Sequence, residues 1–168
     1  RPQHLCTQWV DHDHRVFFLD PDFRCHVNPA CERPAQSYTA DPISSRLYEV
    51  HLTGPRELRP LDKRMLASDA KEMVAACQAL RRDFQMEQVV CVIELPFWAP
   101  LALELRERFG WKVIYDYIDR WYGVLPRSHS MLVEEATLLR EADLVVATAR
   151  LLEEEAKAFN AETCLIPN

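Results

Sequence analysis

The second half of the chain alternates between short apolar runs and segments with helical spacing, and this alternation restricts the fold most. The apolar runs expected as strands cover residues 89–95, 111–116, 143–148 and 163–166. The segments between them, expected as helices, cover residues 99–109, 129–141 and 149–160. These strands are nearly continuous in Val, Ile and Leu, as strands buried on both faces are. The pattern predicts an α/β fold with a mainly parallel sheet, helices on both faces and right-handed crossovers.

The first half gives weaker signals. A helix is expected at 2–12, a strand at 15–20, a second strand at 47–52 and a long helix at 61–84. Glu and His residues interrupt the second strand, so we expect it near a sheet edge. Residues 21–44 hold several prolines and few periodic apolar residues, which predicts a long irregular loop. The 168 residues, 48% of them hydrophobic, suffice for one compact domain. We therefore expect a single Rossmann-like, three-layer α/β/α domain over residues 1–168.

Ligands of such sheets bind beyond the carboxyl ends of the strands, so the residues that follow each strand are the candidate site. Carboxylates and aromatic rings gather there. Flat rings stack on the apolar faces of sugars, and carboxylates accept hydrogen bonds from sugar hydroxyls. We therefore predict a substrate-binding cleft with carbohydrate chemistry, formed by Glu94, Phe97, Trp98, Asp116, Asp119, Arg120 and Trp121.

Each of these residue types also has a structural explanation. Trp98 and Trp121 are equally well explained as core or lid residues, because Trp is often buried. Asp116 and Asp119 are equally well explained as caps of the turn that follows them. Both roles are compatible with one residue, and the sequence leaves the alternatives open.

Several classes of function are disfavoured by what the sequence lacks. It has no Gly-x-Gly-x-x-Gly motif, no phosphate-loop Gly-Lys-Ser/Thr motif and no Gly-x-Ser-x-Gly elbow. With three glycines in all, no loop of this chain is expected to cradle a pyrophosphate, so a nucleotide must be held mainly elsewhere. The net charge is −6 and no basic stripe is visible, which argues against nucleic acid as the main partner. A local basic patch would still allow attraction to an anionic membrane.

Processing signals and cysteines bear on the compartment. No signal-peptide pattern and no apolar run of roughly 20 residues is present. Six cysteines lie largely within apolar periodic segments, and we expect them as free thiols in a reducing compartment. Cys25, His26 and Cys31, with His12 and His14 nearby, lack the close Cys-x-x-Cys pairs of zinc sites, so we expect no metal there. The chain opens with Arg1, so we expect an N-terminus trimmed from a longer polypeptide.

Three stretches, in order, carry a resemblance to a known family. They are Arg1-Pro2-Gln3-His4-Leu5 with His14-Arg15-Val16, then the Tyr-Asp-x-x-Asp segment at 115–119, and last Ala142-Asp143-Leu144-Val145 followed by Ile166-Pro167-Asn168. In these stretches the chain resembles the N-terminal, acceptor-side domain of GT-B fold glycosyltransferases of the group-1, family-4-like, retaining class. The match spans most of the chain except residues 21–60.

The resemblance implies a function and a missing half. It implies that the full-length protein is a hexosyltransferase of polysaccharide biosynthesis, with a nucleotide-sugar donor and a saccharide or lipid-linked glycan acceptor. It further implies that a C-terminal domain, absent from this chain, holds the donor, that no cofactor binds this fragment, and that the fragment alone is inactive. The expected location is cytoplasmic, at the inner face of the membrane. The seven strand-end residues are then acceptor-binding residues, and the catalytic residues stay unknown.

The chain departs from the family at two positions. Many relatives have a His in the loop after the fourth strand, whereas residues 94–98 contain none, and Ala149 stands where the family often has Ser. Two alternatives therefore stay open. One is a non-catalytic binding or scaffold domain of the same fold, and the other is half of a sugar-nucleotide epimerase.

Overall fold

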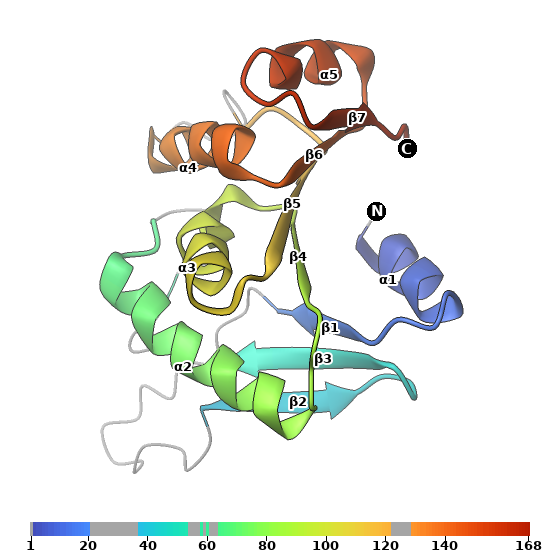
Figure 1. Ribbon diagram of the computed structural model, residues 1–168, viewed down its shortest axis with the longest axis vertical. Coiled ribbons are helices and arrows are strands. Elements are labelled where there is room, and N and C mark those ends of the chain that lie inside the picture. The colour runs from blue at the N-terminus through green and yellow to red at the C-terminus, as the bar shows by residue number, and fades with distance from the viewer. Residues whose placement is uncertain (1, 21–36, 54–57, 59, 61–63, 122–128) are drawn as a thin grey trace.

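The computed structural model describes residues 2–20, 37–53, 58, 60, 64–121 and 129–168. They form two sheets with helices packed on both faces (Figure 1). Helices α2 (Ala67–Asp83) and α3 (Ala99–Phe109) lie on one side of the strands, and α1 (Pro2–Asp11) lies on the other. The predicted Rossmann-like α/β/α fold class is confirmed, with its strands divided between two sheets.

The second half of the chain forms a four-stranded parallel sheet in chain order. Its strands are β4 (Val90–Ile93), β5 (Lys112–Tyr117), β6 (Leu144–Ala147) and β7 (Thr163–Leu165). After α3, the remaining connections are α4 (His129–Glu141) and α5 (Arg150–Lys157). All the strands and helices predicted for this half are confirmed, with small shifts at their ends. The structure adds a 3-10 turn, η1 (Pro96–Trp98), because Pro96 suits the first position of a helical turn.

Two local devices set the start of β5. Helix α3 ends at Gly110, whose φ of 68° lies in the left-handed region, and the Gly110 N–H donates to the Arg106 carbonyl at 2.9 Å. The Asp143 carboxylate, just before β6, then accepts hydrogen bonds from Lys112 Nζ at 2.6 Å and from the Val113 N–H at 2.9 Å. The first two residues of β5 are thereby joined to the residue before β6.

The first half forms a three-stranded sheet in the order β1-β3-β2. Strand β1 (Val16–Leu19) runs parallel to β3 (Leu47–Leu52), and β2 (Tyr38–Pro42) runs antiparallel to it. Two predictions are wrong here. Strand β2 lies inside the segment predicted as an irregular loop, whose residues 21–36 are outside the described ranges. Strand β3 is central and not near an edge.

The alternation of side chains along β3 explains how polar residues occur in a central strand. Val50 is fully buried in the core against α2, with Phe17 and Tyr48 stacked beside it at 5.1 Å between ring centroids. Because side chains alternate along a strand, Glu49 and His51 point to the opposite face. The interspersed polar residues therefore reported the face and not the edge.

Helix α2 begins later than predicted, at Ala67 and not at residue 61. The Leu66 N–H donates to the Asp69 carboxylate at 2.8 Å, which stabilises the first turn of the helix. Residues 61–63 lie outside the described ranges.

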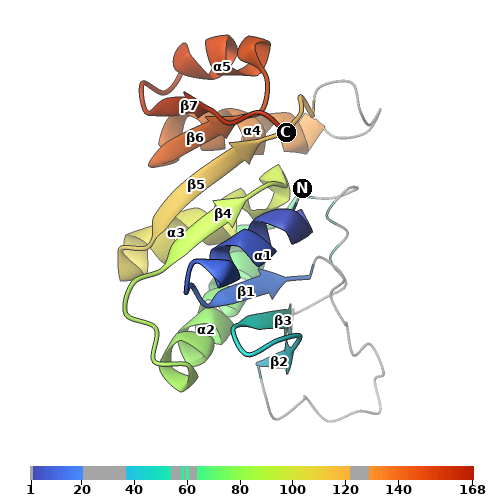
Figure 2. The ribbon, with the colours of Figure 1, turned by 90° about the vertical axis from the view of Figure 1, so that its right-hand side faces the viewer.

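The two sheets lie beside each other without forming one ladder. Strand β1 lies beside β4 in both views (Figures 1 and 2), yet among the described residues each pairs on one side only, β1 with β3 and β4 with β5. Val90, the first residue of β4, is 53% exposed.

Two findings bear on the predicted compartment. Of the six cysteines, the four that the structure describes, Cys6, Cys77, Cys91 and Cys164, are free thiols. Cys25, His26 and Cys31 lie outside the described residues. None of the helices formed by the described residues combines the length and apolar character needed to cross a bilayer.

Candidate functional site

The carboxyl ends of β4 and β5 lie on one side of the molecule, together with both chain ends (Figure 2). These two strands are neighbours in the parallel sheet, with Ile93 opposite Tyr115. Residues 94–98 and 116–121 therefore leave the same edge of the sheet. The seven predicted residues all belong to these two segments, although their exposure differs strongly.

The segment after β4 contributes one reachable ring and one buried ring. Phe97 is 1% exposed and belongs to the core, whereas Trp98 is half-buried. Their rings meet edge to face at 5.5 Å between centroids. Glu94 is half-buried on the side of α1, where burial and the Glu94 charge both raise the pKa of the Cys6 thiol. In this segment, Trp98 is the ring that a ligand can reach.

The segment after β5 divides in the same way. Asp116, the second-last residue of β5, is 2% exposed, whereas Asp119 and Arg120 are exposed. The Arg120 guanidinium pairs with the Glu155 carboxylate of α5, with 2.8 Å between Nε and Oε2. The Tyr117 hydroxyl donates to the same carboxylate at 3.5 Å. A charged cluster of Arg120, Glu155 and Tyr117 thus links the end of β5 to α5.

Glu135 of α4 is a buried carboxylate that sequence reasoning missed. It is 8% exposed, and its Oε1 accepts a hydrogen bond from the Trp121 N–H at 3.2 Å. Burial raises the pKa of Glu135, and the Trp121 hydrogen bond opposes that rise. Tyr115 lies in the same buried region, where burial and the Glu135 charge raise its pKa.

A signal for Glu135 was present in the helical pattern. It occupies the apolar stripe of α4 between Met131 and Leu138, both buried. A carboxylate on the buried stripe of an amphipathic helix is costly unless it has a task, so it marks a candidate functional group. Glu155 gave no such signal, because acidic residues are common on the outer face of a helix such as α5.

The end of β6 holds the loop after β5 in place. The Thr148 hydroxyl donates to the Ile118 carbonyl at 3.0 Å. The next residue, Ala149, is the N-cap of α5 and makes no side-chain capping bond. The departure from Ser at this position therefore removes a cap that a hydroxyl would supply.

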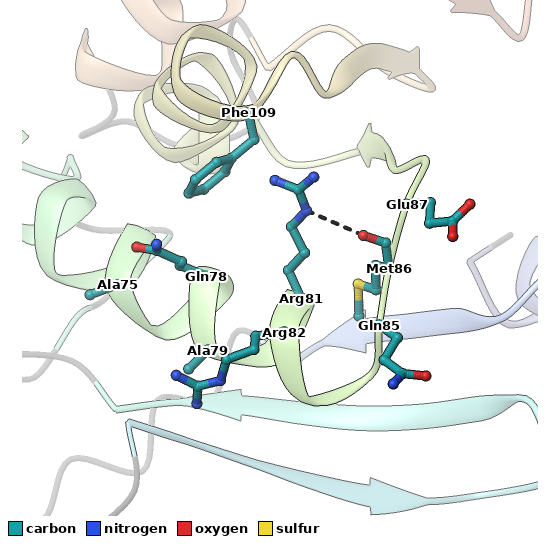
Figure 3. A pocket seen from close by; sticks show the side chains of 9 residues that line it. All are labelled: Ala75, Gln78, Ala79, Arg81, Arg82, Gln85, Met86, Glu87 and Phe109. Carbon is teal, nitrogen blue, oxygen red and sulfur yellow. Dashed lines mark hydrogen bonds between the residues drawn. The ribbon is translucent and has the colours of Figure 1, made fainter.

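A surface hollow lies away from the candidate site, and the cationic side chains that line it make contacts within the fold (Figure 3). It measures about 930 Å³ and lies between the end of α2, the segment before β4 and Phe109, at the opposite end of β4 from the candidate site. Arg81 crosses it, with its guanidinium 5.5 Å from the Phe109 ring centre and its Nε donating to the Met86 carbonyl at 3.2 Å. Arg82 pairs with Asp83 at 2.9 Å. Both cations are engaged in local contacts.

Comparison with known proteins gives a fold and no family. No family model matches the sequence, and no curated protein matches it. Five chains of solved structures match, among them a sucrose-phosphate synthase from Thermosynechococcus elongatus. That match has a TM-score of 0.61 and 16% sequence identity, and it covers 99% of this chain and 82% of the other. The neighbour is a glycosyltransferase, and the likeness supports a GT-B-like fold for this chain.

Proposed function

We propose that this chain is the acceptor-binding half of a nucleotide-sugar-dependent glycosyltransferase. The observation that carries the proposal is the fold likeness to a sucrose-phosphate synthase along 99% of the chain. The aromatic and charged residues beyond β4 and β5 support it, because a sugar acceptor needs rings for its apolar faces and charged groups for its hydroxyls. The acceptor in this proposal is a saccharide or a lipid-linked glycan.

The exposures of these residues suggest different roles for six of the seven, all except Glu94. Asp119 and Arg120 are exposed and, in this proposal, contact the acceptor together with the half-buried ring of Trp98. Phe97 and Asp116 are almost fully buried, so their role is to support the segments that carry the contact residues. Trp121 is half-buried against the core, and its backbone N–H is fixed by Glu135.

The chemistry of transfer in this proposal belongs largely to a second domain. The chain has three glycines and no phosphate-binding motif, so the donor nucleotide is held outside it. The residues at the strand ends position the acceptor hydroxyl, and positioning is a major part of catalysis for a two-substrate reaction. Residues 1–168 alone are then expected to bind acceptor weakly and transfer nothing. Among the described residues, Cys6, Cys77, Cys91 and Cys164 form no disulfide, which supports the cytoplasmic location in this proposal.

The first test compares the product of the natural gene with the 168-residue chain. Each is incubated with a panel of radiolabelled nucleotide-sugars and a panel of saccharide and glycolipid acceptors, and label transfer is measured. We expect sugar transfer by the protein that the natural gene encodes and none by the 168-residue chain. Transfer by the 168-residue chain would refute its role as an acceptor half. If the protein encoded by the natural gene transfers no label with any combination of nucleotide-sugar and acceptor, a binding domain is favoured.

The second test assigns the site. In the active protein encoded by the natural gene, Trp98→Ala is expected to raise the acceptor KM roughly five- to tenfold, which corresponds to a contact of about 1 kcal/mol. The donor KM is expected to stay unchanged. Trp98→Phe keeps a stacking ring and is expected to recover most of the loss.

Asp119→Asn is compared with Asp11→Asn, a matched change at the exposed end of α1. Equal acceptor KM values for these two variants would remove Asp119 from the site.

A further inference from the structure

A second cluster of chemically active side chains lies at the carboxyl ends of β1 and β3. Asp20 follows β1 directly, and its backbone N–H donates to the Val50 carbonyl at 3.0 Å. Glu49 and His51 lie on either side of Val50 in β3, so both side chains point to the face away from α2. Parallel pairing of β1 with β3 therefore brings three potential metal ligands together.

The ligand atoms are close enough to share one ion. One ligand atom from each of Asp20, Glu49 and His51 lies within 4.8 Å of the other two. Glu49 Oε2 is 3.7 Å from His51 Nε2. Two ligands bound tetrahedrally to Zn²⁺ at about 2.1 Å lie roughly 3.4 Å apart. A small rotation of the half-exposed Glu49 side chain is enough to reach that spacing.

His51 supplies an independent reason to expect a ligand. Its side chain is 6% exposed, and neither ring nitrogen has a hydrogen-bond partner. A buried polar atom without a partner is unfavourable, and most such atoms in native proteins bind something. The imidazole lies against the Glu49 carboxylate at a distance too long for a hydrogen bond. An ion between the two groups binds one ring nitrogen of His51 and an oxygen of Glu49.

The donor set indicates which ion. One imidazole and two carboxylates suit a borderline divalent ion, whereas Mg²⁺ and Ca²⁺ prefer oxygen ligands alone. Glu49 is 37% exposed, so the site is open to solvent on that side and water can complete the coordination. We propose that Asp20, Glu49 and His51 bind one Zn²⁺ ion. The ion joins the end of β1 to β3, and the proposal is independent of the proposed glycosyl transfer.

The test measures metal binding by the whole 168-residue chain after dialysis against a chelator. Zn²⁺ is titrated in competition with a colorimetric chelator, and Co²⁺ is used as a visible-absorption probe. We expect one equivalent per chain, d–d bands typical of an ion with nitrogen and oxygen ligands, and no measurable binding of Mg²⁺. At a hundredfold excess of Zn²⁺ over its Kd, the thermal midpoint is expected to rise by roughly 5–10 °C.

Variants locate the ion. His51→Ala and Glu49→Gln are expected to weaken Zn²⁺ binding by at least about tenfold, the lower end of the loss seen for outer-shell partners. His14→Ala, a change at an exposed histidine outside the cluster, is expected to bind as the parent chain does. Glu49→Gln keeps the test valid if His51→Ala does not fold, because Glu49 is partly exposed, and circular dichroism checks the fold of each variant.

Two results would overturn the site. One is the finding that the parent chain binds no Zn²⁺, or that replacing His51 or Glu49 leaves Zn²⁺ binding unchanged. The other is loss of Zn²⁺ binding on Cys25→Ser/His26→Ala/Cys31→Ser with full retention in His51→Ala, which would assign the ion to those residues.

Discussion

Glu135 is a carboxylate whose ionised form the fold disfavours. Burial raises its pKa, so the folded chain holds the Glu135 proton at a pH where the unfolded chain has already released it. Its contribution to stability is therefore lost as the pH rises from the usual Glu range through the folded pKa. At neutral pH the charged carboxylate is a net cost.

Glu135→Gln is expected to increase the thermal midpoint at pH 7, because Gln removes the charge and keeps an oxygen for the Trp121 N–H. The gain is expected to shrink as the pH falls below the usual Glu pKa of about 4.3, where the unfolded chain becomes protonated as well. Calorimetric scans at several pH values measure the difference. A midpoint that falls at pH 7 on this substitution would show that the ionised carboxylate stabilises the fold.

Asp143 behaves in the opposite way. Its hydrogen bond from Lys112, assisted by the Val113 N–H, lowers its pKa in the folded chain. The stability it gives is present above the usual Asp pKa of about 3.9 and is lost as the pH falls through the lower folded value. Between pH 5 and pH 2, the unfolding free energy of the parent chain is therefore expected to fall more steeply than that of Asp143→Asn. Parallel pH profiles of the two chains, measured by urea unfolding, would contradict this.

At the scale of elements, the end of α3 depends on one backbone conformation. Gly110 has a φ of 68°, and a Cβ added there would meet no atom within 4 Å. The cost of a side chain is therefore backbone strain alone. Gly110→Ala is expected to lower the unfolding free energy by about 1 kcal/mol. Gly110→Asn is the matched control and is expected to cost less, because Asn tolerates the left-handed region. Urea unfolding measures both, and equal values for Ala and Gly would show that the turn relaxes.

The elements also show where sequence reasoning succeeds. Strands β4 to β7 were predictable because their residues are mostly apolar and the runs are distinct, as in β6, where Val145, Val146 and Ala147 are all buried. Strand β2 was missed because it is a short edge strand with one covered face, with Thr39 and Asp41 exposed and Pro42 at its end. Its partner β3 was misplaced because Glu49 and His51 were interpreted as signs of an edge, when they mark one face of a central strand.

The same physics limits prediction of the candidate site. The order of strands and helices placed residues 94–98 and 116–121 at one edge, since parallel neighbours end together. The sequence alone did not separate reachable Trp98 from buried Phe97, because adjacent aromatic residues differ only in how η1 packs. The ion pair of Arg120 with Glu155 was also beyond reach, because it joins segments 35 residues apart.

At the scale of the whole molecule, thiol reactivity reports the integrity of the core. Cys77 of α2 is 2% exposed, and burial raises its pKa to about 12. Because the thiolate is the reactive form, Cys77 is expected to react only when the domain unfolds. Half-buried Cys164 on β7 is expected to react earlier. Alkylation followed by peptide mass mapping gives both rates, and Cys77 labelling at the rate of Cys164 in the folded chain would indicate local opening of α2.

The outermost strands of the two sheets, β2 and β7, have a consequence for how the chain behaves in concentrated solution. Each of these two strands pairs on one side only within the described sheets, so one row of its backbone amides and carbonyls is not paired there. Such rows are templates for foreign strands, and native proteins normally cover, charge or bend them. Charge repulsion from a net −6 opposes contact between copies only weakly once salt screens it. Colloidal stability of the isolated 168-residue chain is therefore expected to depend on ionic strength, with light scattering that grows as salt is added.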